Sequence, residues 1–149
     1  MGLAEAPEEL RALAGQMDDV AGQARELGAD LVALRETIGW RSVAAEEYQL
    51  ALLEHAEATA RGAEHVDDVA RALREHADGA AQTLAAIEAA RTFLLSAAEE
   101  AHSVLADLWD GVVDAAEDAR RVLDVVADAP PSPVDPGWLE RARQAGWPG

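Results

Sequence analysis

The feature that most constrains the fold is a run of apolar residues spaced alternately three and four apart in the first third of the chain. The run consists of Leu10, Leu13, Met17, Val20, Ala24, Leu27, Leu31, Leu34 and Ile38. This heptad spacing places the side chains along one side of an α-helix, where a second helix can pack against them. Pro7, Glu8 and Glu9 fit the start of that helix, and Gly39 fits its end. We therefore expect helix one over about residues 8–38.

Two further heptad segments follow in the chain. The second contains Ala44, Tyr48, Leu52, His55, Thr59, Gly62, Val66, Val69 and Leu73, and the third runs from Leu84 to Val126. Asp78-Gly79 lies between them, and this dipeptide favours a turn. An unbroken helix would be about 130 Å long at ~1.5 Å per residue, which is unusual in a small protein. We expect helix two over about 41–77 and helix three over about 80–127, with a bend in one continuing helix as the alternative.

The end of the chain differs in composition. Prolines at 130, 131 and 133 predict a stiff linker, and Asp135-Pro136 predicts the start of a short helix. The tail either docks on the acidic bundle or presents Trp138 and Trp147 for recognition. We therefore expect an all-α fold, an elongated antiparallel helical hairpin extended to a three-helix bundle over residues 1–128. Residues 129–149 form the Pro-rich linker and short C-terminal helix.

Composition excludes several classes of function. A formal net charge of −17 repels nucleic acid and anionic lipid. There is no cysteine for a disulfide or thiolate metal site, and no window of about 18 apolar residues for membrane insertion. The chain shows no general secretory signal, so we expect synthesis in the cytoplasm. The chain has no lysine and no asparagine, and arginine takes the place of lysine throughout. This indicates a GC-rich genome such as that of an actinobacterium.

Candidate catalytic chemistry is sparse. A di-iron bundle needs a Glu-x-x-His motif on each of two helices, and Glu99-x-x-His102 is the single match. His55, His65 and His76 lie a turn or more apart and share no carboxylate arrangement. No glycine-rich phosphate loop, nucleophile elbow or zinc spacing is present. We expect no enzymatic activity, no cofactor and no metal, and we interpret the acidic runs as solvated faces.

The segment between the first two helices carries a family resemblance. It reads Gly39-Trp40-Arg41-Ser42-Val43-Ala44-Ala45-Glu46-Glu47-Tyr48. The segment resembles the hairpin turn of the WXG superfamily, the helical-hairpin substrates of type VII secretion, and most of all the longer actinobacterial variants. The resemblance covers residues 5 to about 95. It implies that Trp40 lies across the helix ends, that Ser42, Ala44 and Ala45 allow close approach, and that Tyr48 fills the first layer of the seam.

The sequence also departs from the family pattern. Ser42 stands where the name-giving glycine would be, and the export signature, a tyrosine with an acidic residue four positions later, is missing. The single tyrosine, Tyr48, is followed at that spacing by Leu52. A literal Trp-x-Gly occurs at Trp109-Asp110-Gly111, which we interpret as coincidence, with a second hairpin turn as the alternative.

The resemblance implies a non-enzymatic, helix-packing protein of a type VII secretion system. Such a protein is either exported or pairs with a larger effector to present it for export. The expected partner is another helical hairpin, or the N-terminal hairpin of the effector, with a homodimer as a further candidate. We expect the partner to pack on Leu52, Val66, Val69 and Leu73. One alternative is a structural coiled coil that homo-oligomerises without a role in secretion; a lipid-surface protein is disfavoured by the acidic faces.

Overall fold

The computed structural model describes residues 4–39, 41–107 and 113–148. These ranges contain four helices and no strand, which confirms the expected all-α class. The helices are α1 (Ala6–Thr37), α2 (Val43–Asp107), α3 (Val113–Ala127) and α4 (Gly137–Gln144). The chain divides into two compact units, an N-terminal unit, Glu5–Asp78, and a C-terminal unit, Gly79–Gly149, so α2 contributes to both. Each unit has its own interior.

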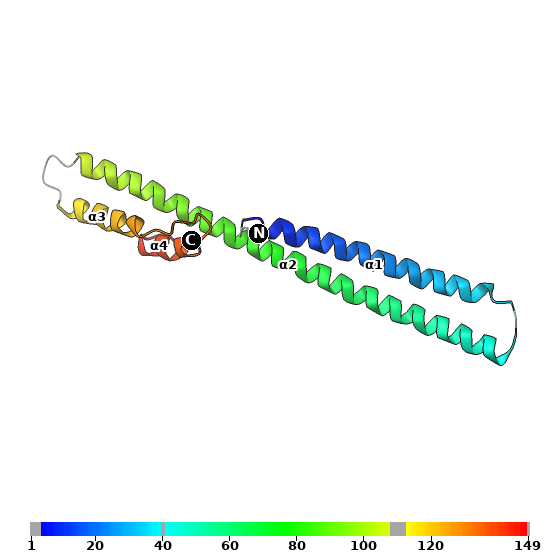
Figure 1. Ribbon diagram of the computed structural model, residues 1–149. Helices are drawn as coiled ribbons and strands as arrows, with labels where there is room; N and C mark the ends of the chain where they lie inside the picture. The colour runs from blue at the N-terminus through cyan, green and yellow to red at the C-terminus, as the bar shows by residue number, and fades with distance from the viewer. Residues whose placement is uncertain (1–3, 40, 108–112, 149) are drawn as a thin grey trace. The chain divides into compact units, whose positions relative to one another are not determined.

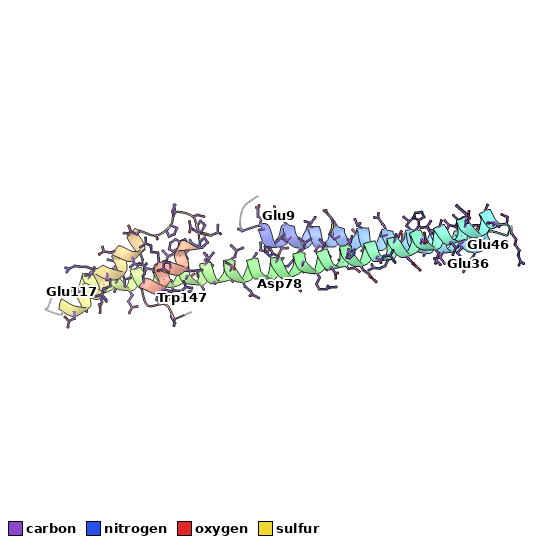
Figure 2. All side chains as sticks on the ribbon, turned by 90° about the horizontal axis from the view of Figure 1, so that it is seen from below. Glu9, Glu36, Glu46, Asp78, Glu117 and Trp147 are labelled. Atoms are coloured by element: carbon purple, nitrogen blue, oxygen red, sulfur yellow. The ribbon has the colours of Figure 1, made fainter. Side chains whose placement is uncertain are left out.

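The N-terminal unit is an antiparallel hairpin of α1 and the first part of α2 (Figure 1). Glu9 and Asp78 lie at one end of this hairpin, and Glu36 and Glu46 lie at the other (Figure 2). Proline in the first turn starts α1, as the sequence predicted. The Oγ atom of Ser42 accepts a hydrogen bond from the Ala45 amide at 3.1 Å, so Ser42 caps the start of α2.

The interior of this hairpin consists mainly of small residues at seven-residue spacing; Leu52 is its large member, and the step from Leu52 to Ala56 is four residues. On α1 the buried positions are Pro7, Ala14, Ala21 and Gly28; on α2 they are Ala45, Leu52, Ala56, Ala63, Ala70 and Ala77. Residues seven apart return to the same side of a helix after two turns, so each set forms a straight stripe. We call the contact between the two stripes the alanine seam.

The alanine seam brings the two backbones close together. A Cβ atom built on Gly28 would lie 3.5 Å from the carbonyl oxygen of Ala56, which is ordinary van der Waals contact. Because the helices are antiparallel, steps of seven residues from this pair place Ala21 beside Ala63 and Ala14 beside Ala70. Alanine removes little apolar area from water, so its burial contributes little hydrophobic stabilisation. It also loses no side-chain rotamer entropy on burial, which partly compensates for that small contribution.

The expected leucine seam is therefore only partly inside the hairpin. Leu10, Met17 and Leu31 are half-buried beside the alanine seam. Ala24 and Ile38 are also half-buried, whereas four members are exposed: Leu13 by 41%, Val20 by 46%, Leu27 by 54% and Leu34 by 45%. The expectation that the whole leucine seam is buried was wrong. The small residues of the alanine seam let the two helices approach closely, so the larger side chains lie at the edge of the contact.

The expected break at Asp78-Gly79 was also wrong, because α2 continues through both residues to Asp107. Glycine costs a helix about 1 kcal/mol relative to alanine, but no proline is present and alanines flank the pair. The Oγ1 atom of Thr83 donates to the Gly79 carbonyl at 3.0 Å, within the helix. The alternative of a continuing helix is the one observed.

The expected helix over 80–127 is divided between two elements. Its first part belongs to α2 and its second part is α3, with residues 108–112 between them outside the described ranges. This stretch contains Asp110, Gly111 and Val112, which are weaker helix formers than alanine or leucine. The Trp109-Asp110-Gly111 motif therefore lies where the described structure gives no information.

The C-terminal unit packs the end of α2, α3 and α4 around one apolar cluster (Figure 1). Its buried members are Ile87, Ala90, Leu94, Trp138 and Ala142, with Phe93, Val125, Val126, Ala129, Leu139, Ala145 and Trp147 packed around them. Trp138 is 7% exposed, and its indole nitrogen donates to the Ser132 carbonyl at 2.8 Å. The tail thus docks on the helices, and this large aromatic side chain anchors it.

The end of α4 folds the chain back onto this cluster. Gly146 has a φ of 91°, the left-handed conformation that glycine adopts without penalty. The amide of Trp147 donates to the Ala142 carbonyl at 2.9 Å, and the amide of Gly146 donates to the Arg143 carbonyl at 3.0 Å. These two bonds form a Schellman motif, which directs Trp147 toward Ala142.

We expect Gly79→Ala to stabilise the protein by up to about 1 kcal/mol, because alanine favours a helix and a Cβ atom there meets nothing within 4 Å. Urea unfolding followed by circular dichroism measures the change. A loss of stability would indicate that the chain needs a break at this position.

We expect the opposite result for Gly137→Ala, where a Cβ atom would lie 2.9 Å from Cγ of the Pro130 ring. Such overpacking costs about 1–3 kcal/mol, so the melting temperature measured by tryptophan fluorescence should fall. Gly62→Ala is the matched control, since its Cβ atom meets nothing within 4 Å. Equal effects of the two substitutions would contradict the described docking of the tail.

Candidate interaction surface

One flank of the alanine seam is held by ion pairs between the helices. Arg11 donates to Asp78 at 2.9 Å, Arg74 pairs with Asp18, and Arg25 pairs with Asp67. The pKa of Arg11 is raised above its ordinary value, first by its hydrogen bond to Asp78 and to a smaller extent by Glu8. These side chains are partly exposed, so water screens the charges and each pair contributes little to stability by itself.

The signs of these charges specify the register of the hairpin. The alanine seam repeats every seven residues, so a slip of one heptad would again set small residues against small residues. Such a slip would bring Asp18 to Asp67 in one direction and to Asp78 in the other. Arg74 would then meet Arg11 or Arg25. Either slip replaces attraction by repulsion, so the ion pairs select the observed register.

Sequence reasoning missed these six residues, although the sequence carries a signal for them. Arg11, Asp18 and Arg25 follow one another at seven-residue spacing with alternating sign, and Asp67 and Arg74 do the same. Opposite charges beside a coiled-coil seam set helix orientation and register.

The opposite flank of the seam is apolar. The ion pairs bring one flank of α1 and one flank of α2 to the same side of the hairpin. The other flank of each helix therefore lies on the opposite side of the hairpin, and these two flanks are next to each other. Half-buried Leu10, Met17 and Leu31 lie next to the seam on this side, with Val66 and Leu73 from α2. Farther out lie the exposed side chains of Leu13, Val20, Leu27 and Leu34 from α1 and of Tyr48 and Val69 from α2. We call these six exposed residues the apolar face.

The residues predicted for the hairpin turn have different environments. Gly39 and Ala44 are exposed, and Ala45 is 1% exposed at the start of the α2 stripe. Trp40 lies outside the described residues. Tyr48 is 47% exposed, so it does not fill the first layer of the seam as expected; its position on α2 directs it to the apolar face.

The residues predicted to pack against a partner are also divided. Val69 is 50% exposed and belongs to the apolar face, and Val66 and Leu73 are half-buried beside it. Leu52 is 5% exposed, so the hairpin itself already covers that side chain. Trp138 and Trp147, considered for recognition by the tail, both pack in the C-terminal unit.

Polar side chains in the described ranges lie at the surface and do not cluster as metal ligands. These ranges include no buried polar side chain and no group of three or more histidine, cysteine or acidic residues that could hold a metal. His102 places Nδ1 2.7 Å from the Ala98 carbonyl oxygen, one turn back on its own helix. Asp68, three residues beyond His65, accepts a hydrogen bond from Arg71 at 2.7 Å.

A shallow hollow of about 300 Å³ lies on the ion-paired flank, lined almost entirely by apolar atoms. Its lining residues are Arg25, Gly28, Ala29, Val32, Leu53, Ala56, Glu57 and Ala60. The hollow offers no nucleophile or proton-transfer pair for a reaction. No helix in the described ranges is long and apolar enough to cross a bilayer.

Comparison with models of known protein families, with curated proteins and with solved structures gives no significant match. The resemblance to the WXG superfamily therefore stays a prediction. The apolar face is the candidate functional site on physical grounds alone, because exposed large apolar patches mark interaction surfaces.

We expect Asp18→Arg to lower the free energy of unfolding by about 0.5–1 kcal/mol, because it places a like charge beside Arg74. Arg74→Asp should do the same beside Asp18, and the double variant should regain most of the loss. A double-mutant cycle in urea unfolding measures the coupling, which should shrink at about 1 M salt. Asp19→Arg is the matched control, because it makes the same charge change at a residue that lies off the ion-paired flank. If the cycle shows no coupling, these pairs do not set the register.

Proposed function

We propose that this protein is a non-enzymatic, helix-packing protein whose N-terminal hairpin binds a second helical hairpin through the apolar face. The observation that supports this most directly is the asymmetry of the two flanks of the alanine seam. One flank carries three ion pairs, with one large apolar side chain, Val32, 36% exposed beside the shallow hollow; the other leaves six large apolar side chains 41–54% exposed. Covering that face with the apolar side of another hairpin would complete a four-helix bundle.

The setting that we propose for this binding is type VII secretion. The support is the resemblance of the segment Gly39–Tyr48 to the turn of the WXG superfamily, together with the antiparallel hairpin that flanks it. In this proposal the protein is either exported or pairs with a larger effector and presents it for export. Because the tyrosine-based export signature is missing, the partner would supply part of the surface that the secretion machinery reads.

A second candidate function is a structural coiled coil that homo-oligomerises without a role in secretion. The same apolar face supports it equally, because the face does not itself identify the machinery that reads it. The two functions differ in whether export depends on a secretion system. Catalysis is not part of either proposal, because the described residues bury no polar or charged side chain.

Export from the bacterium that encodes the chain tests the proposal. The tagged full chain should accumulate in the culture medium, and deletion of the membrane-bound secretion ATPase should abolish this. Leu27→Glu should reduce export about tenfold or more, because a central apolar contact contributes about 1.4 kcal/mol or more to binding. Ala33→Glu adds the same charge on an exposed part of α1 away from the apolar face and should export normally.

The outcomes separate the two functions. Retention in the cell of both the wild-type chain and Ala33→Glu, with the ATPase intact, would contradict a role in secretion and favour the structural coiled coil. Equal export of Leu27→Glu and Ala33→Glu would contradict the role of the apolar face.

A further inference from the structure

In the C-terminal unit, α4 lies in a groove between the last part of α2 and α3. The walls of the groove at this level are apolar residues of both helices, Ile87, Ala90 and Leu94 from α2 and Val125 and Val126 from α3. α4 starts beside Pro130, because a Cβ atom on Gly137 would lie 2.9 Å from that ring, and its end lines a hollow together with Val122. It therefore runs back along α3 and ends beside Val122. The groove accepts a helix, and α4 covers one part of it.

The apolar walls of this groove continue past the end of α4. Steps of three and four residues lead along α2 from Leu94 to Ala97, Ala101 and Val104, and along α3 from Val126 to Val122, Ala119 and Ala115. Such steps keep side chains on one side of a helix, so the two walls continue in the same direction. We call this continuation the open groove; it is lined by Ala97, Glu100, Ala101, Val104, Ala115, Asp118, Ala119 and Val122.

Two adjacent hollows give the open groove its shape. One, of about 310 Å³, lies between α2 and α3, and the other, of about 320 Å³, lies between α3 and the end of α4. Both are lined by Asp118 and Val122, so they lie on the same side of α3, about one helical turn apart. Side chains four residues apart on a helix have the same separation, about 6 Å. A helix with two large apolar side chains one turn apart therefore fits the two hollows.

The charges around the open groove are mainly acidic. Over residues 96–104, α2 contains Glu99 and Glu100 and no arginine. α3 contains four acidic residues and two arginines, which are Asp114, Glu117, Asp118, Asp124, Arg120 and Arg121. Arg121 pairs with Asp118 at 3.1 Å, but both side chains are more than 70% exposed, so this pair opens at little cost. The carboxyl end of α4 adds partial negative charge beside the hollow. Basic side chains are the ones that this rim attracts.

We infer that the open groove binds a short, basic amphipathic helix of a partner protein. This helix carries two large apolar side chains one turn apart for the two hollows, and arginine or lysine beside them for Glu100 and Asp118. The open groove belongs to the C-terminal unit and the apolar face to the N-terminal unit, so the inference does not rest on the proposed function. From Ala97 to Val104 the groove is about 10 Å long at ~1.5 Å per residue, which corresponds to about two turns of the partner helix.

Fluorescence anisotropy with a labelled peptide and the purified full chain tests this inference. The probe is a helix-favouring peptide of about 16 residues, made of alanine and glutamine, with two leucines one turn apart and two arginines flanking them. It should bind with a dissociation constant of roughly 10–100 µM, because the contact is short. Raising the salt from about 50 to about 500 mM should weaken binding severalfold. A peptide with glutamate in place of arginine should bind at least about fivefold more weakly, and one with alanine in place of leucine should not bind.

Three variants of the chain locate the contact. Asp118→Arg reverses a charge between the two hollows and should raise the dissociation constant of the arginine peptide about fivefold or more. Glu117→Arg makes the same charge change at an exposed position of α3 outside the open groove and should change it less than about twofold. Leu27→Glu, on the apolar face, should leave peptide binding unchanged. Circular dichroism should show wild-type helix content for Asp118→Arg, because the Asp118 side chain is 73% exposed.

Each outcome has a distinct meaning. Absence of binding up to about 1 mM of the chain overturns the inference, and so does equal binding of the arginine and glutamate peptides. Binding that is lost in Leu27→Glu but kept in Asp118→Arg places the peptide on the apolar face and overturns the open groove as its site. Equal losses in Asp118→Arg and Glu117→Arg show attraction by net charge alone and also overturn it. The export assay tests the proposed function separately in every case.

Discussion

The close approach of α1 and the first part of α2 through the alanine seam determines the rest of the N-terminal unit. Two helices can approach closely only where the side chains between them are small, and here Ala14, Ala21, Ala63 and Ala70 are all 0% exposed. This approach has a consequence for the larger side chains. The leucines and valines next to the seam do not fit between the helices, so they lie along its edge. The seam that holds the hairpin together therefore also creates the apolar face.

The alanine seam cannot specify its own register, because it repeats every seven residues. Alternating charges on one flank provide that specification, and their placement leaves the other flank available. The N-terminal hairpin thus has two different sides, one with ion pairs between its own helices and one with six large apolar side chains exposed. Packing and register both follow from how residues are distributed around the two helices.

Much of the fold could be predicted from sequence. Heptad spacing and end signals predicted α1 nearly to the residue, and α2 begins at Val43, close to the expected residue 41. The error at Gly79 arose because the turn preference of one dipeptide was weighed above the helix formers around it. The tail was left open because no local pattern shows whether Trp138 can reach Ile87 and Leu94, a contact between distant parts of the chain.

The candidate site was harder to predict, because two stripes compete on α1. Leucine and alanine are both apolar, and the larger residue is the natural choice for a seam. The decisive signal lies on α2, where Ala56, Ala63, Ala70 and Ala77 form an uninterrupted stripe. The stripe next to it contains His55, Gly62 and His76 and is a poor interior. Comparing the two helices, rather than each alone, would have identified the alanine seam.

Urea unfolding of Ala21→Leu, measured below the concentration at which copies of the chain associate, tests the alanine seam most directly. If Ala21 lies between the helices, the larger side chain forces them apart, and the free energy of unfolding should fall by about 1–3 kcal/mol. If the leucine stripe were the interior instead, Ala21 would face outward, and leucine there would leave the stability unchanged. Unchanged stability would contradict this account of the hairpin.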